Sequence, residues 1–249
     1  MDSANFPILD VARLDDPRTL RALDAACREW GFFQAVGHGI DTELLDDLLH
    51  AARRFFAQPL AEKQRIARSA ENPWGFFDRE LTKNTRDWKQ IFDFGPDDGG
   101  RQRPHWPAGL PAFEAAVRAY HGACGGLAER LMDAIGVNLG MPPGALASAF
   151  GAEQTSFLRL NYYPECPEPA APAGTEAPRR GYLGVNHHTD AGALTLLLQD
   201  EQPGLEVFHA DRWHLVEPLP GALVVNIGDV VQVWSNARYL AALHRVRDY

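Results

Sequence analysis

The pattern of the chain changes at about residue 157, and this change constrains the fold more than any other feature. From there on, short apolar or alternating segments follow one another between turn residues, among them "SFLRLNYYP", "ALTLLLQD", "LEVFHA", "RWHLVEPLP" and "ALVVNIGDVVQVW". Segments of this length and spacing are typical of short β-strands. They indicate either a barrel or a double-sheet jelly roll.

The part of the chain before this point mixes helices with short strands. "FPILDVARL" and "FFQAVGHG" are predicted strands, and residues 15–31 and 41–66 are predicted helices with apolar residues at helical spacing. A longer helical region follows the loop "PDDGGRQRPHWPAGLP", although its glycines at 122, 125 and 126 weaken it. The chain is therefore expected to be mostly β with α.

Composition excludes several classes of partner. Asp and Glu number 33 against 24 Lys and Arg, which gives a net charge of -9 and makes non-specific nucleic-acid binding a poor match. The most apolar stretch is interrupted by Asn226 and Asp229 and is too short to span a membrane. Because the first residues lack the pattern of a secretion signal and the three cysteines form no CxxC pair, we expect a cytoplasmic protein, monomeric or weakly oligomeric.

The segment "GVNHHTD" contains a candidate metal site. His188 and Asp190 are two residues apart, so on a strand they share one face, whereas His187 points the other way. A facial site for non-haem iron needs one more histidine, which His244 in "LHRV" offers. Nine histidines in one chain also produce such a triplet by chance, so the spacing alone leaves a structural role open.

Several longer motifs carry a resemblance to a known family. "HTDAGALTLLLQD", "PGLEVF", "PLPGALVVNIGDVVQVWSNARY" and "LHRV" together resemble the Fe(II)/2-oxoglutarate-dependent dioxygenases, in the branch that includes isopenicillin N synthase and the plant flavonoid and gibberellin oxygenases. "ACREWGFFQAVGHGI" and "RLNYYPECPEP" are similar to the N-terminal region and the NYYPxCPxP motif of that branch. The likeness runs along nearly the whole chain in the same order.

The resemblance implies a fold, a site and three regions. The fold is a double-stranded β-helix (jelly roll) core flanked by helices, with an N-terminal α/β region at 1–100, a connecting helical region at 101–152 and the catalytic core at 153–249. His188, Asp190 and His244 match the iron ligands. Tyr163 matches a position near the 2-oxoglutarate end of the pocket, and Asn161 and Arg159 precede it on the same strand face if pairing is regular.

The same resemblance implies the chemistry. Fe(II), 2-oxoglutarate and O2 would act together, with decarboxylation of 2-oxoglutarate to succinate and hydroxylation, desaturation or ring closure of a small organic metabolite. The identity of that metabolite does not follow from the sequence.

One departure from the family pattern stands out. Relatives continue to an Arg-x-Ser motif whose arginine binds the distal carboxylate of 2-oxoglutarate, whereas this sequence stops at "HRVRDY". We expect a truncated form that lacks the last core strand. Otherwise another arginine must bind that carboxylate, and the candidates are Arg159, Arg179, Arg180, Arg245 and Arg247.

Two alternative functions stay open at this point. The first is an iron oxidase of the isopenicillin N synthase type, which does not use 2-oxoglutarate. The second is a non-catalytic jelly-roll protein that binds a ligand or a partner.

Overall fold

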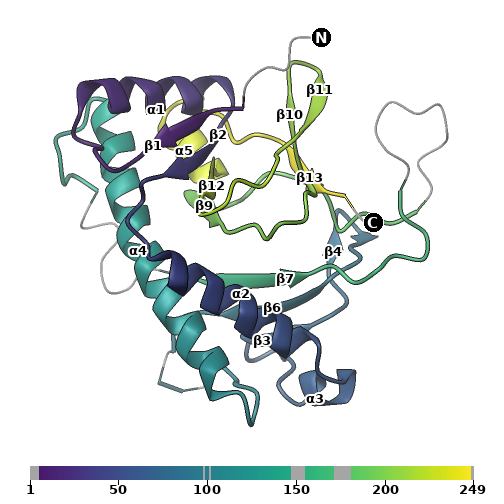
Figure 1. The fold of residues 1–249 in the computed structure, drawn as a ribbon. Coiled ribbons are helices and arrows are strands. Elements are labelled where there is room, and N and C mark those ends of the chain that lie inside the picture. Colours follow the sequence, from purple (N-terminus) through teal and green to yellow (C-terminus); the bar gives the residue numbers. More distant parts are fainter. Residues whose placement is uncertain (1–5, 98, 101, 147–154, 171–180, 248–249) are drawn as a thin grey trace. The chain divides into compact units, whose positions relative to one another are not determined.

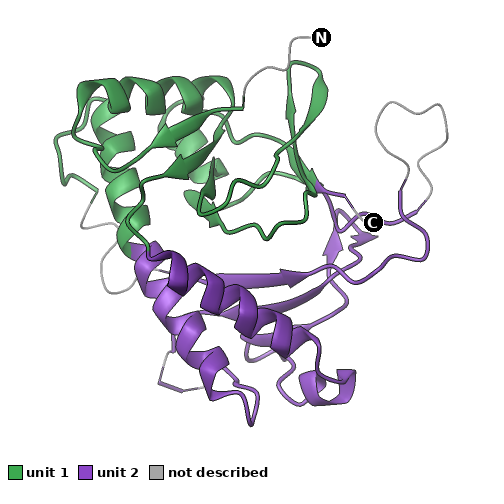
Figure 2. Cartoon of the chain, in the orientation of Figure 1, with its two compact units in different colours: residues 1–40, 126–152, 187–245 green, residues 41–125, 153–186, 246–249 purple. Residues whose placement is uncertain are grey.

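The structure is a computed structural model that describes residues 6–97, 99–100, 102–146, 155–170 and 181–247. Its contacts divide the chain into two compact units, each assembled from segments far apart in the sequence (Figures 1 and 2). Unit 1 contains residues 1–40, 126–152 and 187–245, and unit 2 contains residues 41–125, 153–186 and 246–249.

The first sheet of unit 1 joins strands from both ends of the chain. In order it contains β1 (Ile8–Asp10), β2 (Phe32–Val36), β12 (Leu223–Ile227) and β9 (Leu194–Leu197). β1 pairs with β2 in parallel, and the other two pairings are antiparallel. All five residues of β12 are buried, which explains its nearly continuous apolar run.

The second sheet has the order β11 (Arg212–Leu215), β10 (Leu205–His209), β13 (His244–Val246) and β8 (Val185–His188). One buried cluster joins residues of the two sheets: Phe32 and Val224 from the first pack with Leu205 and Val207 from the second. Trp30 and Val216 complete this core. Two sheets packed face to face over one core confirm the double-sheet jelly roll predicted from the sequence.

The helices of unit 1 begin at identifiable residues. α1 (Pro17–Glu29) begins after Asp16, whose side chain accepts a hydrogen bond from the Arg18 backbone N–H.

The sequence pattern suggested one strand from Ala222 to Trp234, and this is wrong: β12 stops at Ile227, and α5 (Asp229–Trp234) follows. The reversal occurs at Gly228, where a Cβ would collide with the carbonyl oxygen of Gly192.

Unit 2 has its own sheet, β3 (Gly75–Phe77), β6 (Gln90–Phe94) and β7 (Leu158–Tyr162), and a small hairpin of β4 (Leu81–Thr82) and β5 (Thr85–Arg86). Its helices are α2 (Thr42–Phe56) and α3 (Leu60–Gln64), and Pro59 lies between them, within the range predicted as helical. The ring of Phe55 on α2 packs against those of Phe76, Phe92 and Phe113, which forms an aromatic core.

The longest helix, α4 (Pro111–Asn138), begins in unit 2 and ends in unit 1. It is continuous through Gly122, Gly125 and Gly126, each of which costs about 1 kcal/mol relative to alanine. Buried apolar residues on both sides of the glycines, such as Val117 and Leu131, offset that cost. No helix within the described ranges has the length and apolarity needed to cross a membrane.

Candidate metal centre

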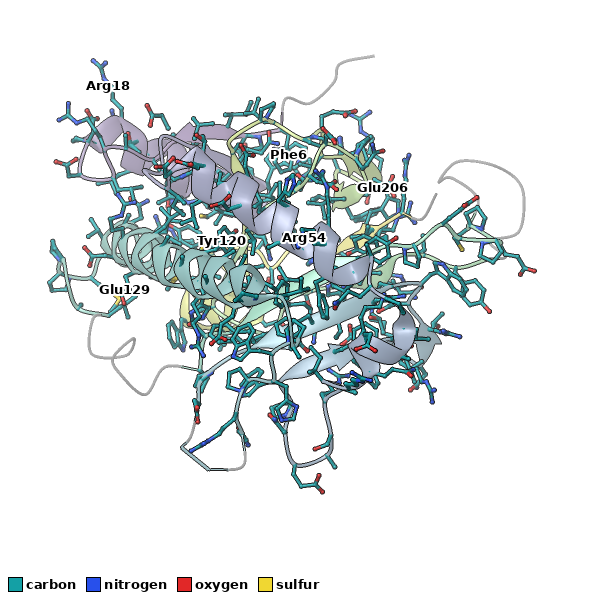
Figure 3. All side chains as sticks on the ribbon, turned by 60° about the horizontal axis from the view of Figure 1, so that its bottom comes forward. Phe6, Arg18, Arg54, Tyr120, Glu129 and Glu206 are labelled. Atoms are coloured by element: carbon teal, nitrogen blue, oxygen red, sulfur yellow. The ribbon has the colours of Figure 1, made fainter. Side chains whose placement is uncertain are left out.

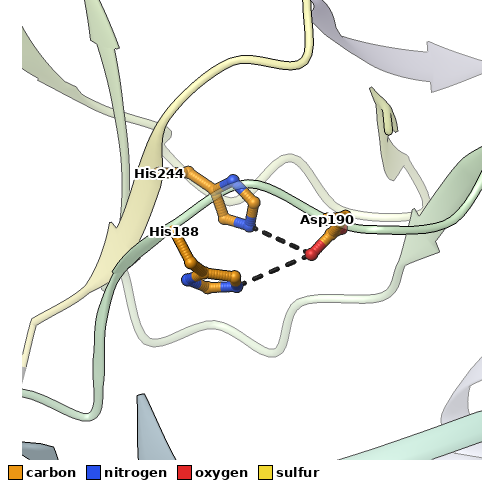
Figure 4. Close-up of side chains that lie close together, drawn as sticks. All are labelled: His188, Asp190 and His244. Carbon is orange, nitrogen blue, oxygen red and sulfur yellow. Dashed lines mark ion pairs between the residues drawn. The ribbon is translucent and has the colours of Figure 1, made fainter. Parts of the chain in front are cut away.

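Three side chains converge in unit 1 (Figure 4). His188 is the last residue of β8, His244 is the first residue of β13, and Asp190 lies in the loop between β8 and β9. Their ligand atoms all lie within 4.8 Å of one another. Oδ1 of Asp190 is 3.5 Å from Nε2 of His188 and 3.6 Å from Nε2 of His244.

The loop, and not strand alternation, directs Asp190 toward the histidines, because β8 ends before it. The backbone carbonyl of Asp190 accepts a hydrogen bond of 2.7 Å from the N–H of Asp229. Two further bonds fix the loop: the N–H of Gly228 donates to Ala193, and that of Val230 donates to Gly192. The first turn of α5 therefore holds the backbone that carries the carboxylate.

The ring of His244 is held in one orientation. Its Nδ1 lies 3.1 Å from the carbonyl oxygen of Ala242, and Phe32 packs edge-on against it with ring centroids 5.1 Å apart. In the tautomer that matches this geometry, Nδ1–H donates to the carbonyl and Nε2 bears a lone pair that faces Asp190. Burial lowers the pKa of His244, and the carboxylate of Asp190 opposes this only in part.

Asp190 remains ionised at this site. Burial by itself would raise its pKa, but the hydrogen bond with His188, the adjacent imidazole of His244 and the donors Thr195 and Asn226 outweigh burial. The pKa of Asp190 is therefore held well below its usual range. A carboxylate and two imidazoles are the ligands that a divalent metal ion requires in deprotonated form.

This donor set fits a divalent ion. A carboxylate oxygen and a lone pair of His244 face each other with no proton to share, which is unfavourable until a cation lies between them. Adjacent ligands with bonds of about 2.1 Å lie about 3 Å apart, so small movements of the side chains suffice. Two imidazoles and one carboxylate are the facial set of non-haem Fe(II) oxygenases.

Among the residues that the sequence suggested for the cosubstrate, Arg159 on β7 is already bound to carboxylates in unit 2. Its Nε and Nη2 donate to the two oxygens of Asp93 at 2.7 and 2.9 Å, and its Nη1 contacts Glu80 at 2.9 Å. Burial tends to lower the pKa of Arg159, but these two acids raise it above its ordinary value. These contacts engage all three nitrogens of the guanidinium, and the cosubstrate role suggested for Arg159 stays a prediction.

The other two suggested residues, Asn161 and Tyr163, lie at and just after the end of β7. Oδ1 of Asn161 is buried and accepts no hydrogen bond from the described part of the chain. Tyr163 follows the end of β7 and is 36% exposed. A Cβ on Gly184 would come within 2.7 Å of the Tyr163 ring, so glycine at 184 leaves the ring its place.

The remaining arginine candidates differ in their surroundings. Arg245 is buried and donates to Glu206, whereas Arg247 is partly buried beyond the end of β13. Arg179 and Arg180 lie outside the described residues.

The sequence did not identify Thr195 and Asn226 as part of the site. Both donate to Oδ2 of Asp190, at 2.6 and 2.9 Å. A signal for Asn226 was present, since it is the polar residue within the otherwise apolar strand "LVVNI". A buried polar side chain in such a strand must have a partner, but the sequence does not say which.

Comparisons with known proteins agree with the site. Residues 6–111 match the family model described as the N-terminal domain of a non-haem dioxygenase in morphine synthesis, and residues 154–249 match that of the 2OG-Fe(II) oxygenase superfamily. Flavanone 3-dioxygenase 2 of Oryza sativa subsp. japonica is 36% identical, over 98% of this chain and 70% of its own length. Jasmonate-induced oxygenase 4 of Arabidopsis thaliana is 35% identical, over 97% of this chain and 67% of its own length.

A solved structure supports the same assignment. The crystal structure of JOX2 in complex with 2OG, Fe and JA aligns with a TM-score of 0.81 and 34% identity, covering 98% of this chain and 70% of that one. These relatives are iron- and 2-oxoglutarate-dependent dioxygenases of small metabolites. The likeness of sequence, fold and ligand set shows that the chain belongs to the Fe(II)/2-oxoglutarate-dependent oxygenase family, whose members are oxidoreductases.

Proposed function

We propose that this protein binds Fe(II) through His188, Asp190 and His244 and oxidises a small organic metabolite, with 2-oxoglutarate and O2 as cosubstrates. The observation that carries the proposal is the convergence of one carboxylate oxygen and two imidazole nitrogens. When bound, the iron supplies the activation of O2 and the decarboxylation of the 2-oxo acid.

The chain holds the ligand side chains in position and in the protonation states that metal binding requires. Asp190 is kept as a carboxylate and His244 as a neutral ring, so both are ready to bind a metal at neutral pH. The Ala242 carbonyl fixes the ring of His244, and α5 fixes the loop of Asp190. We further propose that Tyr163 and Asn161 contact the cosubstrate, a role that the likeness of "RLNYYPECPEP" to the family motif supports.

Several finer assignments belong to the same proposal. The isopenicillin N synthase-like branch is favoured by the motif "NYYPECP", and a cytoplasmic location by the free thiols of Cys27, Cys124 and Cys166. Regions at 1–100, 101–152 and 153–249 stay a prediction, as does a monomeric or weakly oligomeric state. The acidic net charge of -9 supports a small-molecule substrate over nucleic acid.

A titration tests the function directly. Under anaerobic conditions, Fe(II) and then 2-oxoglutarate are added to the protein while the visible metal-to-ligand charge-transfer band is followed. The band is expected in the unmodified protein and in His187→Ala, whose side chain is exposed on the same strand, and it is expected to be lost in His188→Ala. A band that survives in His188→Ala would contradict the assignment of the ligand.

A second candidate function is an iron oxidase that does not use 2-oxoglutarate. One observation favours it: Arg159 and Arg245, both suggested for the distal carboxylate, are paired with acids of this chain. The two functions differ in product, because only the 2-oxoglutarate user forms succinate. Iron binding without the band, together with substrate oxidation that yields no succinate, would identify the oxidase.

A further inference from the structure

The two oxygens of Asp190 have different surroundings. Oδ1 faces Nε2 of His188 and Nε2 of His244, as the dashed lines of Figure 4 show. Oδ2 accepts hydrogen bonds from Thr195 Oγ1 at 2.6 Å and from Asn226 Nδ2 at 2.9 Å. Two donors thus occupy the oxygen that faces away from the histidines, and one oxygen is left for a metal.

The two donors are held side by side by the first sheet of unit 1. Thr195 lies on β9 and Asn226 on β12, and the register of this antiparallel pair places them directly opposite each other. Opposed side chains on one face of a sheet lie about 5 Å apart, which is close enough for both to reach one carboxylate oxygen. The hydrogen-bonded backbone therefore sets the position of both donors before any ligand binds.

Packing alone does not explain an asparagine at position 226. Asn226 is 3% exposed, and its neighbours Val225 and Ile227 are buried and apolar. Burying an amide costs free energy unless it finds a partner, and a leucine would fill the same space without that cost. The hydrogen bond that this amide donates goes to a predicted metal ligand.

On the basis of the proposed iron site, we propose that Thr195 and Asn226 are positioning residues that restrict Asp190 to binding the metal through one oxygen. A carboxylate with a free second oxygen can turn and chelate the ion through both, which consumes a further coordination position. With Oδ2 bound to two donors, Asp190 cannot turn without breaking both bonds. The coordination positions that a cosubstrate and O2 need then stay open.

The test uses Mn(II), which reports through water-proton relaxation how many water molecules the bound ion carries. Thr195→Val removes the hydroxyl at nearly constant shape, Asn226→Leu removes the amide, and Thr195→Ser keeps a hydroxyl as the matched control. We expect the Thr195→Val/Asn226→Leu variant to bind Mn(II) about 10 to 100-fold more weakly, as is typical when partners of a metal ligand are lost. The relaxation per bound ion is expected to fall by about one third, because chelation takes one of the open positions.

The outcomes separate this proposal from the proposed function. Thr195→Ser should match the unmodified protein in both measurements, and Thr195→Val alone carries the test if the double variant does not fold. Unchanged affinity and unchanged relaxation in the valine variant would overturn the positioning role, with the iron site intact. Failure of the unmodified protein to bind Mn(II), or binding indifferent to His188→Ala, would instead overturn the proposed function.

Discussion

Nε of Arg245 donates to Oε2 of Glu206 at 2.6 Å, and both side chains are almost fully buried, with 4% and 0% exposed. The two residues lie on neighbouring strands, β13 and β10, and Figure 3 labels Glu206. The ring of Trp213 packs over the guanidinium, 4.1 Å from its Cζ. Arg245 directly follows His244, so this ion pair fixes the strand that carries a proposed metal ligand.

Removal of one partner of this pair should destabilise the protein. In Arg245→Met the Glu206 carboxylate loses its counter-charge while buried, which costs about 3 to 5 kcal/mol of unfolding free energy. Urea denaturation measures the difference. Glu206→Met/Arg245→Met removes both charges and should recover most of the loss, so equal stability of the single and double variants would contradict an uncompensated charge as the cause.

Gly228→Ala should weaken metal binding through the loop of Asp190. The added methyl group would collide with the carbonyl oxygen of Gly192 and come within 2.9 Å of that of Asp190, so the loop must shift. We expect about 1 to 3 kcal/mol of lost stability, as is usual for overpacking, together with weaker Mn(II) binding. Gly192→Ala is the matched control, since a Cβ there meets no described atom within 4 Å, and the prediction fails if both variants behave alike.

Metal affinity should depend on pH through the imidazole of His244 and not through Asp190. The pKa of Asp190 is far below its usual range, so it stays ionised, whereas His244 must remain neutral to bind a metal. Because burial lowers the pKa of His244, protons compete with the metal at this ring only below about pH 6.5.

The metal-free protein should also become less stable as the pH falls. The folded-state pKa of His244 lies below its unfolded value, so protonation favours the unfolded chain as the pH falls through about 6.5. Mn(II) titrations and urea denaturation between about pH 8 and about pH 5 measure both effects. Stability of the metal-free protein that rises as the pH falls in this range would contradict the neutral, buried His244.

Arg159→Met should act on the stability of unit 2 and leave metal binding intact. Asp93 is nearly fully buried and would lose both hydrogen bonds of its bidentate pair. Arg68 contacts the same carboxylate at 3.3 Å, so part of the charge stays compensated, and we expect about 2 to 3 kcal/mol of lost stability. Loss of 2-oxoglutarate binding in a variant of unchanged stability would instead support the cosubstrate role that the sequence suggested for Arg159.

The sequence by itself determined the change from helical to strand pattern near residue 157, the main helices and the His188, Asp190 and His244 set. These follow from local periodicity and from the order of short motifs, both of which act over a few residues. The structure brings the three suggested ligands together.

Only the tertiary structure decided which polar side chains meet. Asn226 reaches Asp190 across 36 residues, Arg245 reaches Glu206 across 39, and Arg159 reaches Asp93 across 66. Such pairs depend on strand register, and on burial, which removes water as an alternative partner of a polar group. Neither is encoded in the local sequence pattern. The strand predicted through Gly228 failed for the same reason, because the close approach of Gly192 there exists only in the folded chain.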